Sequence, residues 1–209
     1  MKYKVMIVED QTMPRELFEL RVQASERFEL ALSIDNAALA DVYCLRFPVD
    51  LILMDVITRD GENGLDAAAR IKRAFPQIKI IIVTSMPECS YLKRAKEIGV
   101  ESFWYKEEQR ESLLDVMERT MNGESVYPGA SPELTLGMAS SYQFTERELD
   151  ILREITSGDT NQEIADRLNM SVATVKTHIL NMLEKTGFRN RTELAVRARE
   201  SGLVILNRR

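Results

Sequence analysis

The stretch from Asp50 to Asp55 constrains the fold more than any other part of the chain, because four apolar residues, Leu51 to Met54, lie between two carboxylates. A short unbroken apolar run is typical of a strand buried on both faces of a parallel sheet. In open α/β sheets the functional crevice lies at the carboxyl ends of the strands, and Asp55 lies at such an end. Asp55 is therefore either a helix cap or a reactive carboxylate, and the other strand ends must decide.

Similar apolar runs recur through the first 121 residues and alternate with segments of helical spacing. Leu17, Phe18 and Val22 are expected on the inner face of the first helix. Four residues are available for the inner face of the second helix: Ala37, Ala38, Val42 and Leu45. Alternating strands and helices predict an α/β fold with a doubly wound, five-stranded parallel sheet. The predicted strands cover residues 5–8, 28–33, 51–54, 78–83 and 101–104, and the predicted helices cover 15–24, 36–47, 65–75, 88–98 and 108–121.

The predicted strand ends present polar groups: Glu9 and Asp10, then Asp55, Thr84 and Lys106. If three carboxylates converge, each close pair costs on the order of a few kcal/mol at an effective dielectric constant of ~20, so protons or a cation must neutralise them. Oxygen ligands without His or Cys suit Mg²⁺. Lys106 and Thr84 could hold an anionic group delivered to Asp55, and a carboxylate can act as a nucleophile toward phosphorus.

This arrangement of residues resembles the receiver domain of bacterial two-component response regulators, which has a flavodoxin-like fold, over residues 1–121. The resemblance implies that Asp55 is the phosphoacceptor. It further implies that Thr84 contacts the phosphoryl group and that Lys106 pairs with it. The implied Mg²⁺ ligands are Glu9, Asp10, Asp55 and the backbone carbonyl of Ile57.

One further match and two departures bear on the resemblance. Phe103 lies where the family keeps an aromatic switch residue, three positions before Lys106, although simple core packing is the reading that we favour for it. Receivers usually carry Pro four residues after the phosphoacceptor, where this chain has Arg59. The loop from Asp55 to Gly64 is also one residue longer than usual. The loop geometry, and with it the phosphorylation rate and the metal affinity, is therefore open.

Residues 122–143 show no period and are rich in Gly, Pro and Ser, so we expect an interdomain linker between domains at 1–121 and 144–209. In the second domain, capping boxes at Thr145 and Glu148 and at Thr160 and Glu163 mark helix starts. The third of four short helices has Val172, Val175, Ile179 and Met182 on its inner side and Thr174, Lys176, Thr177, Leu180 and Asn181 on its outer side. The order of elements predicts an all-α, four-helix domain with a helix-turn-helix.

The run from Phe144 to Leu203 resembles the DNA-binding domain of LuxR-type regulators, including Thr145-x-x-Glu148, Asn161-x-Glu163-Ile164-Ala165 and Thr174-Val175-Lys176-x-His178. His178, the only histidine of the chain, is expected to pack against the helices and not to act as a ligand or catalyst. The last helix, 192–200, is where such domains pair, with Val196 and Arg199 as contacts. Leu180 lies where some members carry a cation. The implied DNA contacts are Thr160, Asn161, Thr174, Lys176, Thr177, Asn181 and Lys185.

Composition limits the alternatives without deciding among them. The net charge is −5, and residues 144–209 carry 11 basic and 10 acidic residues, so charge alone does not indicate nucleic acid. Cys44 and Cys89 lack metal-ligand spacing, which favours a reduced setting without disulfides. We find no signal peptide or membrane span, and we expect a cytoplasmic protein that does not interact with membranes.

Together the two domains resemble a NarL/FixJ-type response regulator. The implied function is that of a transcription factor: a sensor histidine kinase phosphorylates Asp55, and this controls dimerisation and sequence-specific binding to double-stranded DNA. We do not expect an enzyme, beyond the receiver's own phosphorylation and dephosphorylation. Two alternatives stay open: a regulator that does not depend on phosphorylation, motivated by Arg59 and the longer loop, and a switch whose second domain binds a protein.

Overall fold

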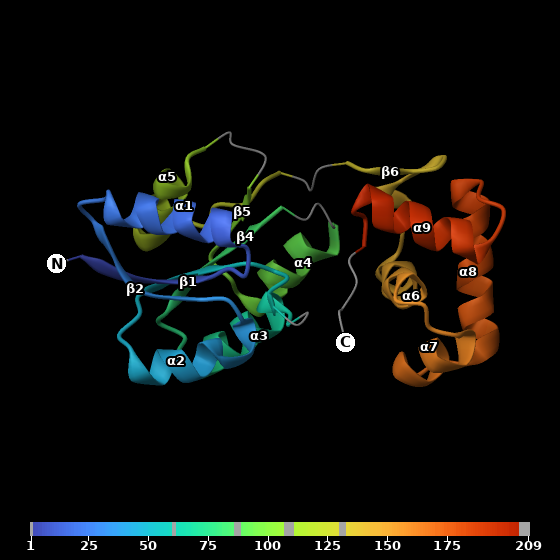
Figure 1. The fold of residues 1–209 in the computed structure, drawn as a ribbon, viewed down its shortest axis with the longest axis horizontal. Coiled ribbons are helices and arrows are strands. Elements are labelled where there is room, and N and C mark those ends of the chain that lie inside the picture. Colours follow the sequence, from blue (N-terminus) through green and yellow to red (C-terminus); the bar gives the residue numbers. More distant parts are fainter. Residues whose placement is uncertain (1, 60–61, 86–88, 107–110, 130–132, 205–209) are drawn as a thin grey trace. The chain divides into compact units, whose positions relative to one another are not determined.

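The computed structural model describes residues 2–59, 62–85, 89–106, 111–129 and 133–204, and it divides into two compact units (Figure 1). The first unit consists of Met1–Ser85 and Tyr91–Gly129, and the second consists mainly of Ala130–Arg209. None of the helices in the described ranges combines the length and the apolar character that a bilayer-spanning helix requires.

The first unit is a five-stranded parallel sheet in the order β2-β1-β3-β4-β5, as the alternating pattern predicts. Figure 1 shows α1 and α5 on one face of the sheet and α2, α3 and α4 on the other. Its elements are β1 (Tyr3–Val8), α1 (Thr12–Gln23), β2 (Phe28–Ile34), a 3₁₀ turn (Ala37–Leu39), α2 (Ala40–Arg46), β3 (Leu51–Met54), α3 (Gly64–Ala74), β4 (Lys79–Thr84), α4 (Cys89–Ile98), β5 (Ser102–Tyr105) and α5 (Leu113–Met121).

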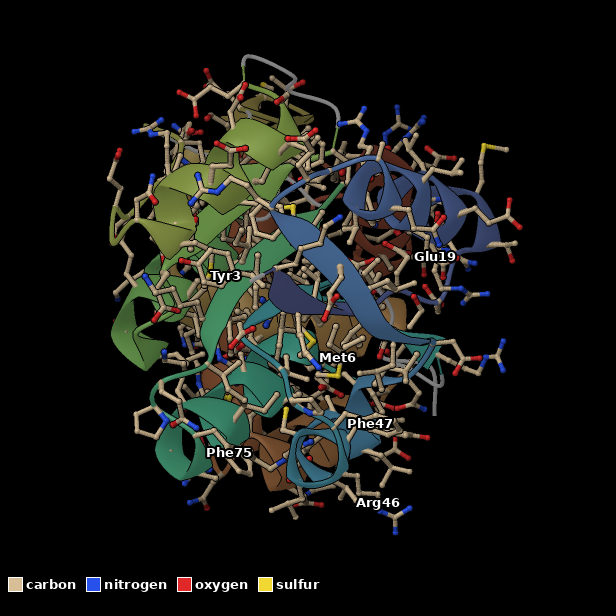
Figure 2. The ribbon with its side chains drawn as sticks, turned by 90° about the vertical axis from the view of Figure 1, so that its left-hand side faces the viewer. Tyr3, Met6, Glu19, Arg46, Phe47 and Phe75 are labelled. Carbon is tan, nitrogen blue, oxygen red and sulfur yellow. The ribbon has the colours of Figure 1, made fainter. Side chains whose placement is uncertain are left out.

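The central strands are buried on both faces, as their unbroken apolar runs predict. All four residues of β3 are buried, and Met6 lies inside the sheet layer in Figure 2. On the face covered by α1 and α5, the ring of Trp104 meets the ring of Phe18 edge-on, with their centroids 6.5 Å apart. This packing fixes the carboxyl ends of β1, β3, β4 and β5 along one edge of the sheet.

The outer strand β2 is irregular. Val5 of β1 faces Leu30, but the next residue, Met6, faces Leu32, so Ala31 has no partner on β1. One extra residue in one of two paired strands is a β-bulge, which bends the strand and increases its twist.

The inner face expected for the second helix is confirmed at Ala37 and wrong at Val42 and Leu45. Val42 is 37% exposed and Leu45 is 73% exposed, whereas Ala37 and Ala40 are fully buried. The reason is the 3₁₀ turn, because α2 starts only at Ala40 and its small residue faces the sheet. Val42 follows two residues later, about 200° around the helix. Figure 2 shows Arg46 and Phe47, which lie at the C-terminal end of this helix.

Leu17 is also more exposed than expected, at 45%, while Phe18 and Val22 are buried as predicted. Neighbouring positions on a helix point about 100° apart, so α1 directs Phe18 toward the sheet and leaves Leu17 at the margin.

The second unit is a small helical bundle preceded by a short hairpin. Its elements are β6 (Thr135–Leu136), β7 (Ala139–Ser140), a 3₁₀ turn (Ser141–Gln143), α6 (Glu146–Thr156), α7 (Asn161–Arg167), α8 (Val172–Thr186) and α9 (Arg191–Ser201). The predicted capping boxes of Thr145 and Thr160 are both present. Between α7 and α8, Asn169 adopts a φ of 53°, the left-handed conformation that Asn tolerates in tight turns. These helices confirm the expected helical second domain.

The described parts of residues 122–143 pack against one unit or the other. In the first unit, the backbone N–H of Phe103 donates to the carbonyl of Val126 at 2.8 Å, and the hydroxyl of Tyr127 donates to the carbonyl of Val100 at 2.7 Å. In the second unit, Leu136 and Ala139 are buried in the helical core. The stretch expected to be a linker therefore lengthens both folded units.

Candidate functional site

Three carboxylates meet where β1 and β3 end. The two strands are paired, with Val8 opposite Met54, so Glu9 and Asp10 follow one strand beside Asp55, which follows the other. Oxygen atoms of the three side chains all lie within 4.8 Å of one another. Glu9 is 1% exposed and Asp55 is 5% exposed. The structure thus brings together the carboxylates that the strand ends pointed to.

Lys106, beyond the end of β5, supplies a positive charge to this cluster. Its Nζ lies 2.5 Å from Oε2 of Glu9 and 3.0 Å from Oδ2 of Asp55. Burial alone would lower the pKa of Lys106, but the two carboxylates outweigh it and raise the pKa above its ordinary value. The lysine is therefore protonated at neutral pH.

Asp55 has an unusual environment for a carboxylate. Burial raises the pKa of Asp55 to about 7, the charge of Glu9 adds to the rise, and Lys106 opposes it. The backbone N–H of Val56 also donates to Oδ1 of Asp55 at 2.7 Å and favours the ionised form. One ammonium faces three carboxylates, so the described cluster lacks positive charge.

Thr84 and Phe103 complete the set predicted for this edge. Thr84 is fully buried at the end of β4, and its carbonyl accepts a 2.9 Å hydrogen bond from the backbone N–H of Lys106. Phe103 is buried, with ring centroids 5.0 Å from Tyr105 and 6.4 Å from Tyr127. This packing suits a core residue, and a switching role for Phe103 stays a prediction.

The loop after Asp55 is closed by Gly64. A Cβ at Gly64 would lie 1.9 Å from the carbonyl oxygen of Asp55, so no side chain fits there without moving the backbone. The N–H of Gly64 donates to the carbonyl of Val56 at 2.8 Å, and Ile57 is paired with Asn63. This part of the loop is therefore fixed on both sides of Ile57. Two further residues of the loop, Thr58 and Arg59, make contacts that sequence reasoning missed.

In the second unit, α8 has one buried and one exposed side, as its spacing predicts. Val175, Ile179 and Met182 are buried in the core of the bundle. The opposite side is exposed and carries Thr174, Lys176, Thr177, Leu180 and Asn181, while His178 is half-buried. The face predicted to meet DNA is therefore free of the domain's own core.

Three other predicted DNA contacts take part in interactions within the domain. The hydroxyl of Thr160 caps α7 by accepting from the N–H of Glu163 at 3.3 Å. Oδ1 of Asn161 accepts from the guanidinium of Arg191 at 2.8 Å, and the same guanidinium donates to the carbonyl of Asp159 at 2.6 Å. Sequence reasoning missed Arg191, since this pairing joins residues 30 positions apart.

Lys185 is the third predicted DNA contact with partners inside the domain. Its Nζ lies 2.7 Å from both carboxylate oxygens of Glu148 and 2.9 Å from the carbonyl of Gln143. Burial would raise the pKa of Glu148, but hydrogen bonds from Lys185 and Thr145 outweigh it and lower the pKa below its ordinary value. Lys185 therefore has a structural role, and its contact with DNA stays a prediction.

Family models match both units. The model described as response regulator receiver domain matches residues 5–118, and the model described as bacterial regulatory proteins, luxR family, matches residues 142–198. The response regulator protein VraR of Staphylococcus epidermidis is 33% identical over 212 residues, covering 98% of this chain and all of the relative. VraR of Staphylococcus aureus is 32% identical over the same length.

Solved structures share the fold. RcsB of Salmonella enterica serovar Typhimurium, bound to a promoter in the presence of the phosphomimetic BeF3-, has a TM-score of 0.60 at 19% identity and covers 98% of this chain and 100% of its own. The response regulator ChrA of a heme-sensing two-component system has a TM-score of 0.53 at 21% identity, covering 97% and 99%. At these identities the likeness supports the fold alone.

Proposed function

This chain belongs to the bacterial response regulators in which a receiver domain precedes a LuxR-type DNA-binding domain, and we propose that a sensor histidine kinase phosphorylates it on Asp55. The observation that carries the proposal is the cluster at the ends of β1 and β3, where Lys106 bridges Glu9 and Asp55. In the proposed reaction an oxygen of Asp55 attacks the phosphorus of a phosphohistidine. The P–N bond breaks and an acyl phosphate forms.

The donor set of the cluster fits Mg²⁺. Glu9, Asp10 and Asp55 offer hard carboxylate oxygens, and we assign the backbone carbonyl of Ile57 as a fourth ligand. Bound Mg²⁺ would neutralise the carboxylates and coordinate phosphoryl oxygens. Lys106 is held where its ammonium can pair with the phosphoryl group, and Thr84 is assigned the remaining contact.

The output of the switch is binding to double-stranded DNA as a homodimer. In our proposal the exposed side of α8 enters the major groove, with Thr174, Lys176, Thr177 and Asn181 at base edges or phosphates. The phosphate backbone is contacted nearby, by Thr160, Asn161 and Lys185. Pairing through α9 would match two half-sites on DNA with two-fold symmetry, and phosphorylation shifts the population toward this paired state.

Intact-mass measurement after incubation with Mg²⁺ and acetyl phosphate tests the proposal. We expect one phosphate adduct on the wild type and none on Asp55→Asn. Asp50→Asn is a matched control, because Asp50 lies at the other end of the same strand. Within the described ranges, the one hydrogen bond to its carboxylate comes from the backbone N–H of Lys4, at 2.8 Å. It should keep the adduct. A wild type without an adduct would favour the regulator that does not depend on phosphorylation.

A gel shift with sheared genomic DNA tests the output. We expect the phosphorylated wild type to bind more tightly than the unmodified protein. Equal affinity in both states would remove phosphorylation from control of DNA binding. Absence of binding in both states would favour the second domain as a protein-binding output.

A further inference from the structure

The loop that follows Asp55 is fastened to the loop that follows β2. The backbone N–H of Arg59 donates to the carbonyl of Asp35 at 3.1 Å, and the guanidinium of Arg59 lies 2.7 Å from Oδ2 of Asp35. A second tie joins the same loops, since the N–H of Ala37 donates to the hydroxyl of Thr58 at 2.9 Å. Thr58 and Arg59, in the loop after Asp55, are therefore both held by residues 35–37, in the loop after β2.

The hydroxyl of Thr58 is the centre of this connection. Besides accepting from Ala37, it donates to the carbonyl of Glu62 at 3.1 Å, and the N–H of Thr58 donates to the same carbonyl at 3.1 Å. Thr58 is 2% exposed and Ala37 is fully buried. Water cannot readily replace the hydroxyl here, so its loss would leave the N–H of Ala37 buried without a partner.

The anchored residues adjoin the residue whose carbonyl we assign to Mg²⁺. Ile57 lies directly before Thr58, and Val56 on its other side accepts the hydrogen bond from Gly64. The backbone on either side of the Ile57 carbonyl is thus held, on one side by Gly64 and on the other by Thr58. A displaced Thr58 would carry the Ile57 carbonyl with it.

We propose that Thr58 is a positioning residue for the phosphorylation site, which holds the Ile57 carbonyl in place by fastening its loop to Ala37. Arg59 and Asp35 reinforce the same connection from outside. This inference rests on the proposed function of the cluster. It gives a role to the residue that replaces the usual Pro: an ion pair to the neighbouring loop takes over the restraint that a proline ring provides.

The hydrogen bonds of Thr58 and the ion pair of Arg59 with Asp35 differ in strength. The Thr58 bonds are buried, whereas Arg59 and Asp35 have side chains that are 59% and 38% exposed. Water and salt weaken an exposed ion pair far more than a buried hydrogen bond. We therefore expect Thr58 to dominate and Arg59 to contribute a smaller part.

The test uses Thr58→Val, which keeps the shape but removes the hydroxyl, and Thr58→Ser, which restores it. The readout is Mg²⁺ titration of the full chain followed by fluorescence of Trp104, the only tryptophan, which lies two residues before Lys106. We expect Thr58→Val to raise the half-saturating Mg²⁺ concentration about tenfold. Thr58→Ser should stay within about twofold of wild type, and Arg59→Ala should raise this concentration by about two- to fivefold.

Phosphorylation by acetyl phosphate gives the second readout. For a positioning residue, the rate of Thr58→Val recovers at saturating Mg²⁺ to within about twofold of wild type, because the chemical groups are intact. A variant that is merely misfolded would not recover. The double variant Asp35→Arg, Arg59→Asp reverses the ion pair without altering Thr58. It should restore the Mg²⁺ affinity that Arg59→Ala loses.

Every outcome of these experiments either supports or overturns the role of Thr58. If Thr58→Val titrates like the wild type, or if Thr58→Ser fails as badly as Thr58→Val, the inference is overturned while the proposed function stands. If Thr58→Val does not fold, the single and exchanged Arg59 variants decide, and identical Mg²⁺ titrations for all of them overturn it. A wild type that takes up neither Mg²⁺ nor phosphate removes the proposed function and this inference together.

Discussion

Each of the two units pairs a lysine with buried carboxylates, with opposite results. In the first unit, Lys106 bridges Glu9 and Asp55 while Asp10 completes a cluster of three acids. In the second, Lys185 meets a single acid, Glu148. The chemistry is the same, but one site has surplus negative charge and the other is balanced.

The pKa values show what this difference does. Burial raises the pKa of Asp55 to about 7, because Lys106 offsets that rise only in part. Burial acts in the same direction on Glu148, yet hydrogen bonds from Lys185 and Thr145 outweigh it and lower its pKa. One carboxylate that is hydrogen-bonded to one lysine stabilises the fold. Three carboxylates that face one lysine repel one another, and a bound cation can relieve this repulsion.

The largest effect should follow from breaking the balanced pair. Lys185→Met leaves Glu148 buried without its cation, and we expect the second unit to lose about 3 kcal/mol of stability. Calorimetry of the full chain would show its transition at lower temperature. Arg197→Met is the control, because its ion pair with Glu200 is exposed and should matter by less than about 1 kcal/mol. Equal losses in both variants would contradict the contrast.

In the first unit we expect a smaller change in stability, and this one is a gain. Asp55→Asn removes one of three carboxylates, so the metal-free receiver should gain about 1–3 kcal/mol at pH 8. Because the folded-state pKa of Asp55 is raised to about 7, the folded protein keeps that proton up to about pH 7. The unfolded chain has already lost this proton near its ordinary pKa, so the gain should grow from about pH 4 to about pH 7 and then level off. Urea unfolding in EDTA measures it, and a destabilised variant would refute it.

The smallest effect concerns the surface. Lys176 is exposed on α8, so Lys176→Ala should leave stability unchanged and weaken DNA binding by about 1 kcal/mol. If the lysine contacts a phosphate, the slope of log affinity against log salt falls by about 1. Arg73→Ala, an equal charge change on the exposed side of α3, is the control. Indistinguishable salt slopes for the two variants would place recognition elsewhere.

Sequence reasoning reached the features that depend on neighbouring residues or on strand ends. The apolar run before Asp55 and the capping box of Thr145 are local, and parallel pairing then brings the strand ends together. Geometry that depends on how distant segments meet was not accessible. The hydrogen bond between Thr58 and Ala37 joins residues 21 positions apart, and that between Lys185 and Glu148 joins residues 37 positions apart. The exposed position of Val42 followed from a 3₁₀ turn that shifted the helix phase.

The bulge at Ala31 in β2 has a consequence for the chain as a whole. β2 is the outer strand of the sheet, and the sequence Phe28–Ile34 holds one charge and no proline. Such an edge, if straight, would offer a template on which another strand could add. The extra residue shifts the register with β1, and such a bulge bends and twists the strand, which disfavours the addition of a second chain along its outer edge. The bulge thereby works against copies of this chain joining edge to edge as a growing sheet.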